Sequence, residues 1–270
     1  MRRRGLTLAW CSPAFLLLLG TFAGADSSRS RQTRIDRLLV SVPGDGVFLF
    51  DLQGKVLWSH RCEPYDACDA GGGRFLITDR HAGRVFSINR EGQTDWEKTG
   101  LQGPVNAEPV GNGNVLILEN DTGRALEVAP GGETVREFSN HRNPFDARRR
   151  SNGNTVIADS GNNRIVEYDP QGQLIRQTAG LKFPNSLYLL PGGHTLFTTY
   201  TNGTVGELDA GGMLLWERRI GGTLYSVATE GESLWVSDGA GGRVLRISRE
   251  GTVLQEIKLG KTFVDVAYCR

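Results

Sequence analysis

The sequence predicts an all-β protein that folds as a six-bladed β-propeller. The first observation is a period of about 40 residues, marked by a Gly in a short turn between two apolar alternating stretches. The second is the abundance of such turns, with 36 glycines among 270 residues. Short strands bounded by Gly/Asn turns at regular spacing are typical of four-stranded blades arranged around an axis. The marker glycines are Gly54, Gly92, Gly132, Gly172, Gly212 and Gly251.

Each repeat shows the same order of four expected strands. A first strand with a polar residue near its start precedes a Gly/Asn turn, as at 111–114, and a strongly apolar second strand, as at 115–118. The third strand alternates between polar and apolar residues, as at 84–88, and the marker Gly separates it from the fourth. This period-two pattern predicts four-stranded antiparallel sheet in every repeat.

The two ends of the repeat array complement each other. The first repeat begins at about 37–40, a stretch that matches the second strands of the other repeats. The stretch 264–268 is a first strand with no blade after it. Pairing of the two stretches completes one blade and removes the open edges of the array. We therefore expect three-plus-one closure by the C-terminal strand.

The N-terminus differs from the repeats and predicts a secretory signal. Three arginines at 2–4 precede an apolar run at 6–19, and the small residues at 23–25 fit a cleavage site. The alternative is a retained membrane anchor, but the run is shorter than the about 20 residues that a span needs. We expect a signal peptide at 1–25, a disordered leader at 26–36 and the propeller at 37–270.

Charge and cysteine content are compatible with a secreted or periplasmic globular protein. The chain has 31 basic and 30 acidic residues, a balance that indicates no nucleic-acid partner. We expect a monomer that meets the membrane only through the signal segment before cleavage. Cys62, Cys68 and Cys269 remain in the mature chain. They allow either one disulfide with one spare thiol or three buried thiols.

One repeat resembles a known family in its residues. The stretch NGNTVIADSGNNRIVEYD, at 152–169, is similar to an NHL repeat nearly residue for residue, and looser copies extend from about Leu38 to the C-terminus. The Gly-x-x-x-Trp turns at 54–58, 92–96 and 212–216 are also similar to quinoprotein-type repeats. Quinoprotein rings usually have more blades and a cofactor platform that has no counterpart here. The resemblance implies a propeller and leaves the activity open.

Four repeats carry an acidic residue at the end of the second strand and an Arg at the start of the third. The other two repeats lack both residues, which indicates that acid and Arg pair with each other. A carboxylate–guanidinium bond would hold each turn, a structural role. The expected pairs are Asp79 with Arg84, Glu119 with Arg124, Asp159 with Arg164, and Asp238 with Arg243.

A polar residue near the start of each first strand predicts a ring around the central channel. Their oxygen atoms could bind calcium or magnesium, or they could hold a column of water. The metal candidates are Asn106, Asp146 and Asp265. The resemblance to the gluconolactonase family implies calcium bound by Glu, Asn and Asp, of which the Glu has no match here. The ring comprises Asp66, Asn106, Asp146, Ser186, Ser226 and Asp265.

The loops that connect successive blades supply two further candidates. The loop at 139–143 is the most polar and is expected to overhang the channel. It contains His141, the candidate catalytic residue, and Arg142, a candidate ligand-binding residue.

Two functions from different classes are compatible with this pattern. The first is an exported binding module that recognises a peptide, glycan or protein partner on its loop face. The alternative is a metal-assisted hydrolase or lyase, lactonase-like or arylsulfotransferase-like, with its site at the channel mouth.

Overall fold

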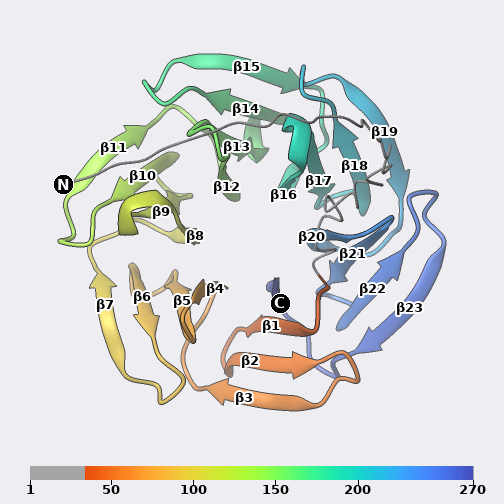
Figure 1. Ribbon diagram of the computed structural model, residues 1–270, viewed down its shortest axis with the longest axis horizontal. Helices are drawn as coiled ribbons and strands as arrows, with labels where there is room; N and C mark the ends of the chain where they lie inside the picture. The colour runs from red at the N-terminus through yellow and green to blue at the C-terminus, as the bar shows by residue number, and fades with distance from the viewer. Residues whose placement is uncertain (1–33, 270) are drawn as a thin grey trace, which may run out of the picture. The chain divides into compact units, whose positions relative to one another are not determined.

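The computed structural model describes residues 34–269, which form six four-stranded antiparallel sheets around a central axis (Figure 1). The predicted six-bladed β-propeller is confirmed. The first strand of each blade lies next to the channel and the fourth lies on the outside (Figure 1). The second strands are covered on both faces by neighbouring blades, which explains their continuous apolar sequences.

We number the blades in chain order. Blade 1 contains β1 (Arg37–Val42), β2 (Gly46–Asp51), β3 (Val56–His60) and β24 (Asp265–Cys269). Blade 2 contains β4 (Asp66–Gly71), β5 (Arg74–Asp79), β6 (Arg84–Ile88) and β7 (Thr94–Lys98). Blade 3 contains β8 (Pro104–Pro109), β9 (Val115–Glu119), β10 (Arg124–Val128) and β11 (Thr134–Phe138), with the short 3-10 helix η1 (Gly111–Gly113).

The remaining three blades repeat this order. Blade 4 contains β12 (Asp146–Arg149), β13 (Thr155–Asp159), η2 (Ser160–Asn162), β14 (Arg164–Tyr168) and β15 (Leu174–Ala179). Blade 5 contains β16 (Pro184–Leu189), η3 (Pro191–Gly193), β17 (Thr195–Thr199), β18 (Thr204–Leu208) and β19 (Leu214–Arg219). Blade 6 contains β20 (Leu224–Glu230), β21 (Ser233–Asp238), β22 (Arg243–Ile247) and β23 (Val253–Lys258).

Closure of the ring follows the predicted three-plus-one arrangement. Strand β24 pairs antiparallel with β1, so that Cys269 lies opposite Arg37 and Asp265 opposite Ser41. The buried side chain of Ile35 packs into the hydrophobic cluster shared by blades 1 and 6. Ile35 falls within the predicted disordered leader, so the ordered chain begins before residue 37. The predicted signal peptide and the leader up to residue 33 lie outside the described residues.

The marker glycines are required by the turn between the third and fourth strands. All six have a positive φ, between 80° and 94°, where residues with a Cβ are rare. At Gly172, the turn closes with a hydrogen bond from its N–H to Asp169 O (3.0 Å) and another from Asp169 N to Gln173 O (2.9 Å). The sequence period therefore arises because every blade needs a residue with a positive φ at the same place in this turn.

Two further features of residues 34–269 concern membranes and thiols. Within this range no helix has the length and apolar character that crossing a bilayer requires. Cys62, Cys68 and Cys269 are all free thiols. Of the two alternatives for these cysteines, the structure therefore shows three thiols and no disulfide among them.

Candidate functional site

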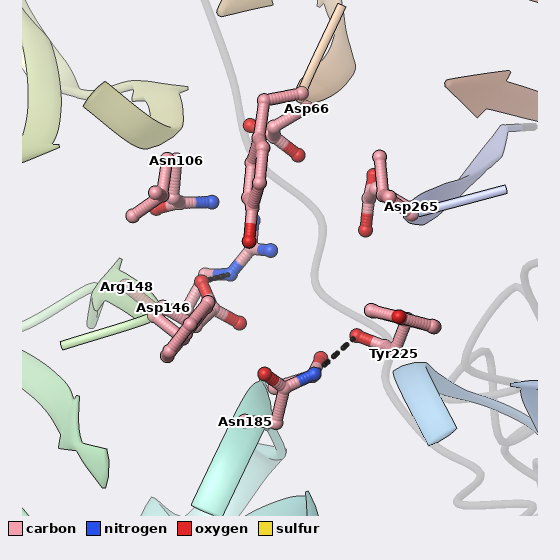
Figure 2. Close-up of a pocket in the computed structure, with 12 residues that line it drawn as sticks. Asp66, Asn106, Asp146, Arg148, Asn185, Tyr225 and Asp265 are labelled. Atoms are coloured by element: carbon pink, nitrogen blue, oxygen red, sulfur yellow. Dashed lines mark hydrogen bonds and ion pairs between the residues drawn. The ribbon is translucent and has the colours of Figure 1, made fainter. Parts of the chain in front are cut away.

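The start of each first strand brings most of the predicted ring residues together at one end of the channel. Asp66, Asn106, Asp146 and Asp265 come from four different blades and point towards the axis (Figure 2). Ser186 lines the same opening. Ser226 lies deeper, where its hydroxyl contacts Ser237 Oγ (2.6 Å) and Tyr268 OH (3.1 Å). We call this end the channel mouth; it opens on the crossing-loop face, where each blade connects to the next.

Three of the ring residues also fasten neighbouring blades together. Each accepts a hydrogen bond from a backbone N–H of the next blade. Because a buried N–H must find an acceptor, part of the polar pattern in this ring serves the fold. The bonds run from Ala107 N to Asp66 Oδ2 (3.0 Å), from Ala147 N to Asn106 Oδ1 (3.3 Å) and from Leu187 N to Asp146 Oδ2 (2.7 Å).

Arg148 occupies the channel and was not among the predicted site residues. Its Nε lies 2.9 Å from Asp146 Oδ1, and its Nη1 lies 3.4 Å from Glu108 Oε2. Arg148 and Glu108 each follow a ring residue by two positions, so they share its face of the strand. That spacing was the signal in the sequence from which both residues could have been found.

The channel holds more carboxyl groups than basic groups. Burial raises the pKa of Asp66 to about 6 and that of Glu108 to about 7. Burial, together with repulsion from Asp66, raises the pKa of Asp265 well above its usual value. Asp66 and Asp265 are hydrogen-bonded to each other, so the pair holds a shared proton near neutral pH.

Two cavities meet at the narrowest part of the channel. The cavity at the mouth has a volume of about 30 Å³, enough for about two water-sized groups. The cavity on the other side has a volume of about 380 Å³. Asp66, Arg148, Ser186 and Asp265 line both cavities and therefore separate them.

The predicted metal ligands are arranged unlike a calcium site. Among residues 34–269, no three His, Cys, Asp or Glu side chains are grouped so that they could hold a metal ion. Asn106 and Asp146 each use one oxygen to accept a backbone hydrogen bond. Arg148, beside Asp146, already places a positive charge where the calcium ion would have to bind, and it would repel that ion. The geometry therefore does not favour calcium at Asn106, Asp146 and Asp265.

His141 does not overhang the channel, contrary to the expectation from its loop. The ring is buried, with Nδ1 3.1 Å from Gly123 O and Nε2 3.0 Å from Tyr168 OH. Burial lowers its pKa. The loop turns away from the axis because the backbone N–H of His141 also bonds to Gly123 O (3.2 Å). Arg142, in the same loop, is exposed and, like His141, lines neither channel cavity.

All four of the expected acid–Arg pairs are formed. The acids are buried, and three of them also accept a backbone N–H from the preceding crossing loop, at Gln102, Arg142 and Thr223. The pairs therefore lie where they fasten loops to blades. The N···O distances are 3.2 Å for Arg84–Asp79, 2.6 Å for Arg124–Glu119, 2.7 Å for Arg164–Asp159 and 3.0 Å for Arg243–Asp238.

In the Glu119–Arg124 pair, we expect loss of the acid to lower the free energy of unfolding more than loss of the base. Glu119 also accepts hydrogen bonds from Gln102 N (2.9 Å) and Thr122 Oγ1 (2.6 Å). Glu119→Ala leaves these donors without their acceptor, and we expect it to lower the free energy of unfolding by about 2 kcal/mol. For Arg124→Ala, at a side chain that is partly in solvent, we expect about 1 kcal/mol. Urea denaturation measures both; an equal or larger loss for Arg124→Ala would contradict the assignment.

Four aromatic side chains that were not among the predicted site residues form an arc beside the mouth. We call Phe145, Phe183, Tyr200 and Tyr225 the aromatic arc. Successive ring centroids are 5.6 Å, 6.1 Å and 5.6 Å apart. Phe145 and Tyr225, at the two ends of the arc, also line the mouth cavity. Each of these two residues directly precedes a ring residue, and Tyr65 does the same before Asp66, which was the available sequence signal.

The backbone of Phe183 is held in an unusual conformation. Its φ is 57°, in the left-handed region that bulky residues rarely adopt. Two hydrogen bonds maintain it: Phe183 N donates to Asn163 Oδ1 (3.0 Å), and Tyr200 N donates to Phe183 O (3.1 Å). The result is a ring placed between Phe145 and Tyr200, the latter 41% exposed.

Comparison with solved structures shows the fold. A protein of unknown function from Bacteroides caccae is 18% identical, with a TM-score of 0.71 and coverage of 86% of this chain and 98% of that one. Virginiamycin B lyase from Staphylococcus aureus is 15% identical, with a TM-score of 0.65 and coverage of 83% and 84%. A chain of a nidogen/laminin complex is 12% identical, with a TM-score of 0.69 and coverage of 85% and 97%.

Comparison of sequences gives a family. No curated protein matches the chain. The resemblance of residues 152–169 to an NHL repeat remains a prediction, because the family match found is to a different family. Residues 43–254 match the family described as "Outer membrane protein assembly factor BamB". Because this match spans most of the propeller, the chain belongs to that family.

Proposed function

We propose that the protein is an exported, non-catalytic propeller that binds an extended segment of a partner protein across its aromatic arc. The observation that carries this proposal is the arc itself, with Phe183 held at a φ of 57° and Tyr200 41% exposed. Strained backbone conformations cluster at functional sites, where the surrounding structure maintains them. Partly exposed aromatic rings supply large contact areas at a low entropic cost and are enriched at protein interfaces.

The position of the arc supports a peptide-like ligand. Its four residues come from blades 4, 5 and 6, so the rings follow the rim of the channel rather than forming a closed pocket. An extended chain can place successive side chains along such a curve. The polar mouth beside Phe145 and Tyr225 then offers hydrogen-bonding groups to one end of the bound segment.

The family description supports the same class of function and the location. It names an assembly factor of the outer membrane, a role that involves protein partners. Together with the signal peptide predicted at 1–25, it favours a periplasmic or secreted protein. The hydrolase or lyase alternative has no specific support in the channel, because His141 lies elsewhere. The likeness to virginiamycin B lyase, at 15% identity, concerns the fold.

Phe183→Gly is expected to weaken peptide binding while it leaves the protein folded. A displayed library of short peptides selects ligands for the wild-type protein, and fluorescence anisotropy measures their dissociation constants. We expect binding to weaken by about tenfold or more, which corresponds to about 1.4 kcal/mol. The melting temperature should fall little, because Gly relieves a left-handed strain of about 1 kcal/mol.

Two further variants make this test specific. Tyr200→Ala should weaken binding as Phe183→Gly does. Leu215→Ala removes a side chain that is 52% exposed on the outer strand β19 and should change nothing. The proposal is wrong if the library yields no ligand, or if the selected peptides bind both arc variants as tightly as the wild type.

A further inference from the structure

The amide of Asn106 directs an unused hydrogen-bond donor into the channel mouth. Asn106 is 4% exposed, and its Oδ1 accepts the bond from Ala147 N. This bond decides which way the amide is turned, so that Nδ2 faces the mouth cavity (Figure 2). None of the described residues accepts a hydrogen bond from Nδ2. This donor is open to the mouth cavity, where an acceptor on a ligand can reach it.

A second amide directs an unused acceptor to the same cavity. Asn185 is 6% exposed, and its Nδ2 donates to Leu224 O (3.2 Å) and Tyr225 O (3.4 Å). Figure 2 shows the bond to Tyr225. The two bonds identify Nδ2, which leaves Oδ1 as an acceptor that no donor among residues 34–269 uses. The mouth thus contains one amide donor and one amide acceptor, contributed by different blades.

The charge of the mouth favours a cation. Arg148 is the one basic side chain among the described residues that line it, and its ion pairs are with Asp146 and Glu108. Asp66 and Asp265 have no ion pair with a basic group of the described chain. Their hydrogen bond to each other leaves the carboxyl pair with negative charge inside a low-dielectric channel.

The size of the mouth selects a small cation. A space of about 30 Å³ admits about two groups the size of a water molecule, which matches an ammonium with a neighbouring carbonyl oxygen and is less than a sugar ring needs. An ammonium has three N–H donors, and Asp66, Asp265 and Asn185 offer acceptors. A lysine side chain supplies the ammonium but no acceptor for Asn106. At a peptide amino terminus, the first carbonyl oxygen lies beside the ammonium.

We infer that the channel mouth binds the free amino terminus of the partner segment, with the α-ammonium at Asp66, Asp265 and Asn185 and the first carbonyl at Asn106. This inference rests on the proposed function, because the rest of the segment lies along the aromatic arc. The arc then contacts the side chains of the segment, and the mouth determines the position of its first residue. Capture of a terminal amine by convergent acceptors is a general mode of peptide recognition.

The test compares three probes of matched size by isothermal titration calorimetry. The first is the amide of phenylalanyl-glycine with a free α-amine, the second is its N-acetylated form, and the third is N-acetyl-lysinamide. We expect the first to bind at least about tenfold more tightly than the other two. Equal binding of the acetylated form overturns the inference, and preferential binding of the lysine probe assigns the mouth to a side-chain ammonium instead, which also overturns it.

Asp265→Asn tests the residue assignment while it keeps the shape of the side chain. The variant should weaken binding of the free-amine probe by about tenfold or more and leave the acetylated probe unaffected. Asp69→Asn is the matched control, because Asp69 lines the larger cavity and not the mouth. An unchanged affinity of Asp265→Asn for the free-amine probe, in a folded protein, contradicts the inference.

Binding of the ammonium should also depend on the ionisation of Asp66. The pKa of Asp66 is about 6 in the unbound protein, and Asp265, Arg148 and Asp146 are the charged groups that face it. Because the ammonium pairs with the ionised carboxylate, affinity for the free-amine probe should rise between pH 5 and pH 7. The acetylated probe should show no such rise, and a rise of the same size for that probe counts against the assignment.

Failure of this inference and failure of the proposed function give different results. If only the inference fails, free and acetylated library peptides bind equally, and Phe183→Gly weakens both. If the proposed function fails, replacement of Phe183 changes the binding of neither the free nor the acetylated form of any peptide.

Discussion

Replacement of Arg148 by methionine is expected to lower the free energy of unfolding by about 3 kcal/mol at pH 8. Methionine keeps much of the length of the side chain but removes the positive charge beside Asp146 and Glu108. Both carboxyl groups are then left in the channel without a cation, and removal of one partner of a buried pair is strongly destabilising. Equilibrium unfolding in urea measures the change.

The destabilisation should shrink as the pH falls. The folded pKa values of Asp66 (about 6) and Glu108 (about 7) lie above their ordinary values, so in the wild type these groups stabilise the protein at low pH, and the stabilisation is lost as the pH rises through 6 and 7. Arg148 lowers both pKa values. Without it they rise further, so the penalty of Arg148→Met develops above about pH 5 and is largest at pH 8.

Two controls keep this prediction specific. Arg142→Met removes an exposed arginine from the neighbouring loop and should change stability by less than about 0.5 kcal/mol. Arg148→Met combined with Glu108→Gln removes one of the unpaired acids and should recover part of the loss. A single Arg148→Met variant as stable as the wild type at pH 8 would show that the channel ion pairs contribute nothing.

Removal of the closing strand is expected to have the second large effect. A chain that ends at Val264 lacks β24, with its pairing to β1 and the buried side chains of Val266 and Cys269. Blade 1 then has three strands, and β1 becomes an open edge beside the channel. We expect a loss of about 5 kcal/mol or more, comparable with the whole stability of many domains. Circular dichroism and size-exclusion chromatography should show unfolding or aggregation.

A circular permutant tests whether β24 stabilises the ring when it is attached at a different place in the chain. Because Cys269 lies opposite Arg37, a short turn can join residues 265–269 to the start of β1 as a hairpin. We expect this permutant to recover the native melting temperature to within a few degrees. A truncated protein that melts like the wild type would show that β24 does not close the ring.

Much of the fold could be predicted from the sequence because its determinants are local and repeated. Gly172 and its five counterparts need a left-handed backbone in the same hairpin turn, so they recur at one period. The unpaired second strand at 37–40 and the unpaired first strand at 264–268 identify each other by the same comparison. Pairing of each acid with an Arg five residues later was accessible for the same reason, since the turn between them brings the two together.

The candidate site was predictable only in part. The positions of Asp66, Asn106 and Asp146 at the axis follow from the strand order. Their use as acceptors for the next blade does not, because each bond joins residues 41 apart in the chain. His141 shows the converse error. Its loop has the polar composition of a binding loop, but contacts with Gly123 and Tyr168 take its ring away from the channel.

The sequence alone thus determined the number of blades, their strand order and the way the ring closes, because these depend on patterns within one repeat. Only the tertiary structure decided which polar residues face the channel unpaired, where Arg148 balances the carboxyl groups and how four aromatic rings meet at the mouth. Those properties arise where different blades converge on one axis. Distance, burial and charge between residues far apart in the chain decide them, and no single repeat contains that information.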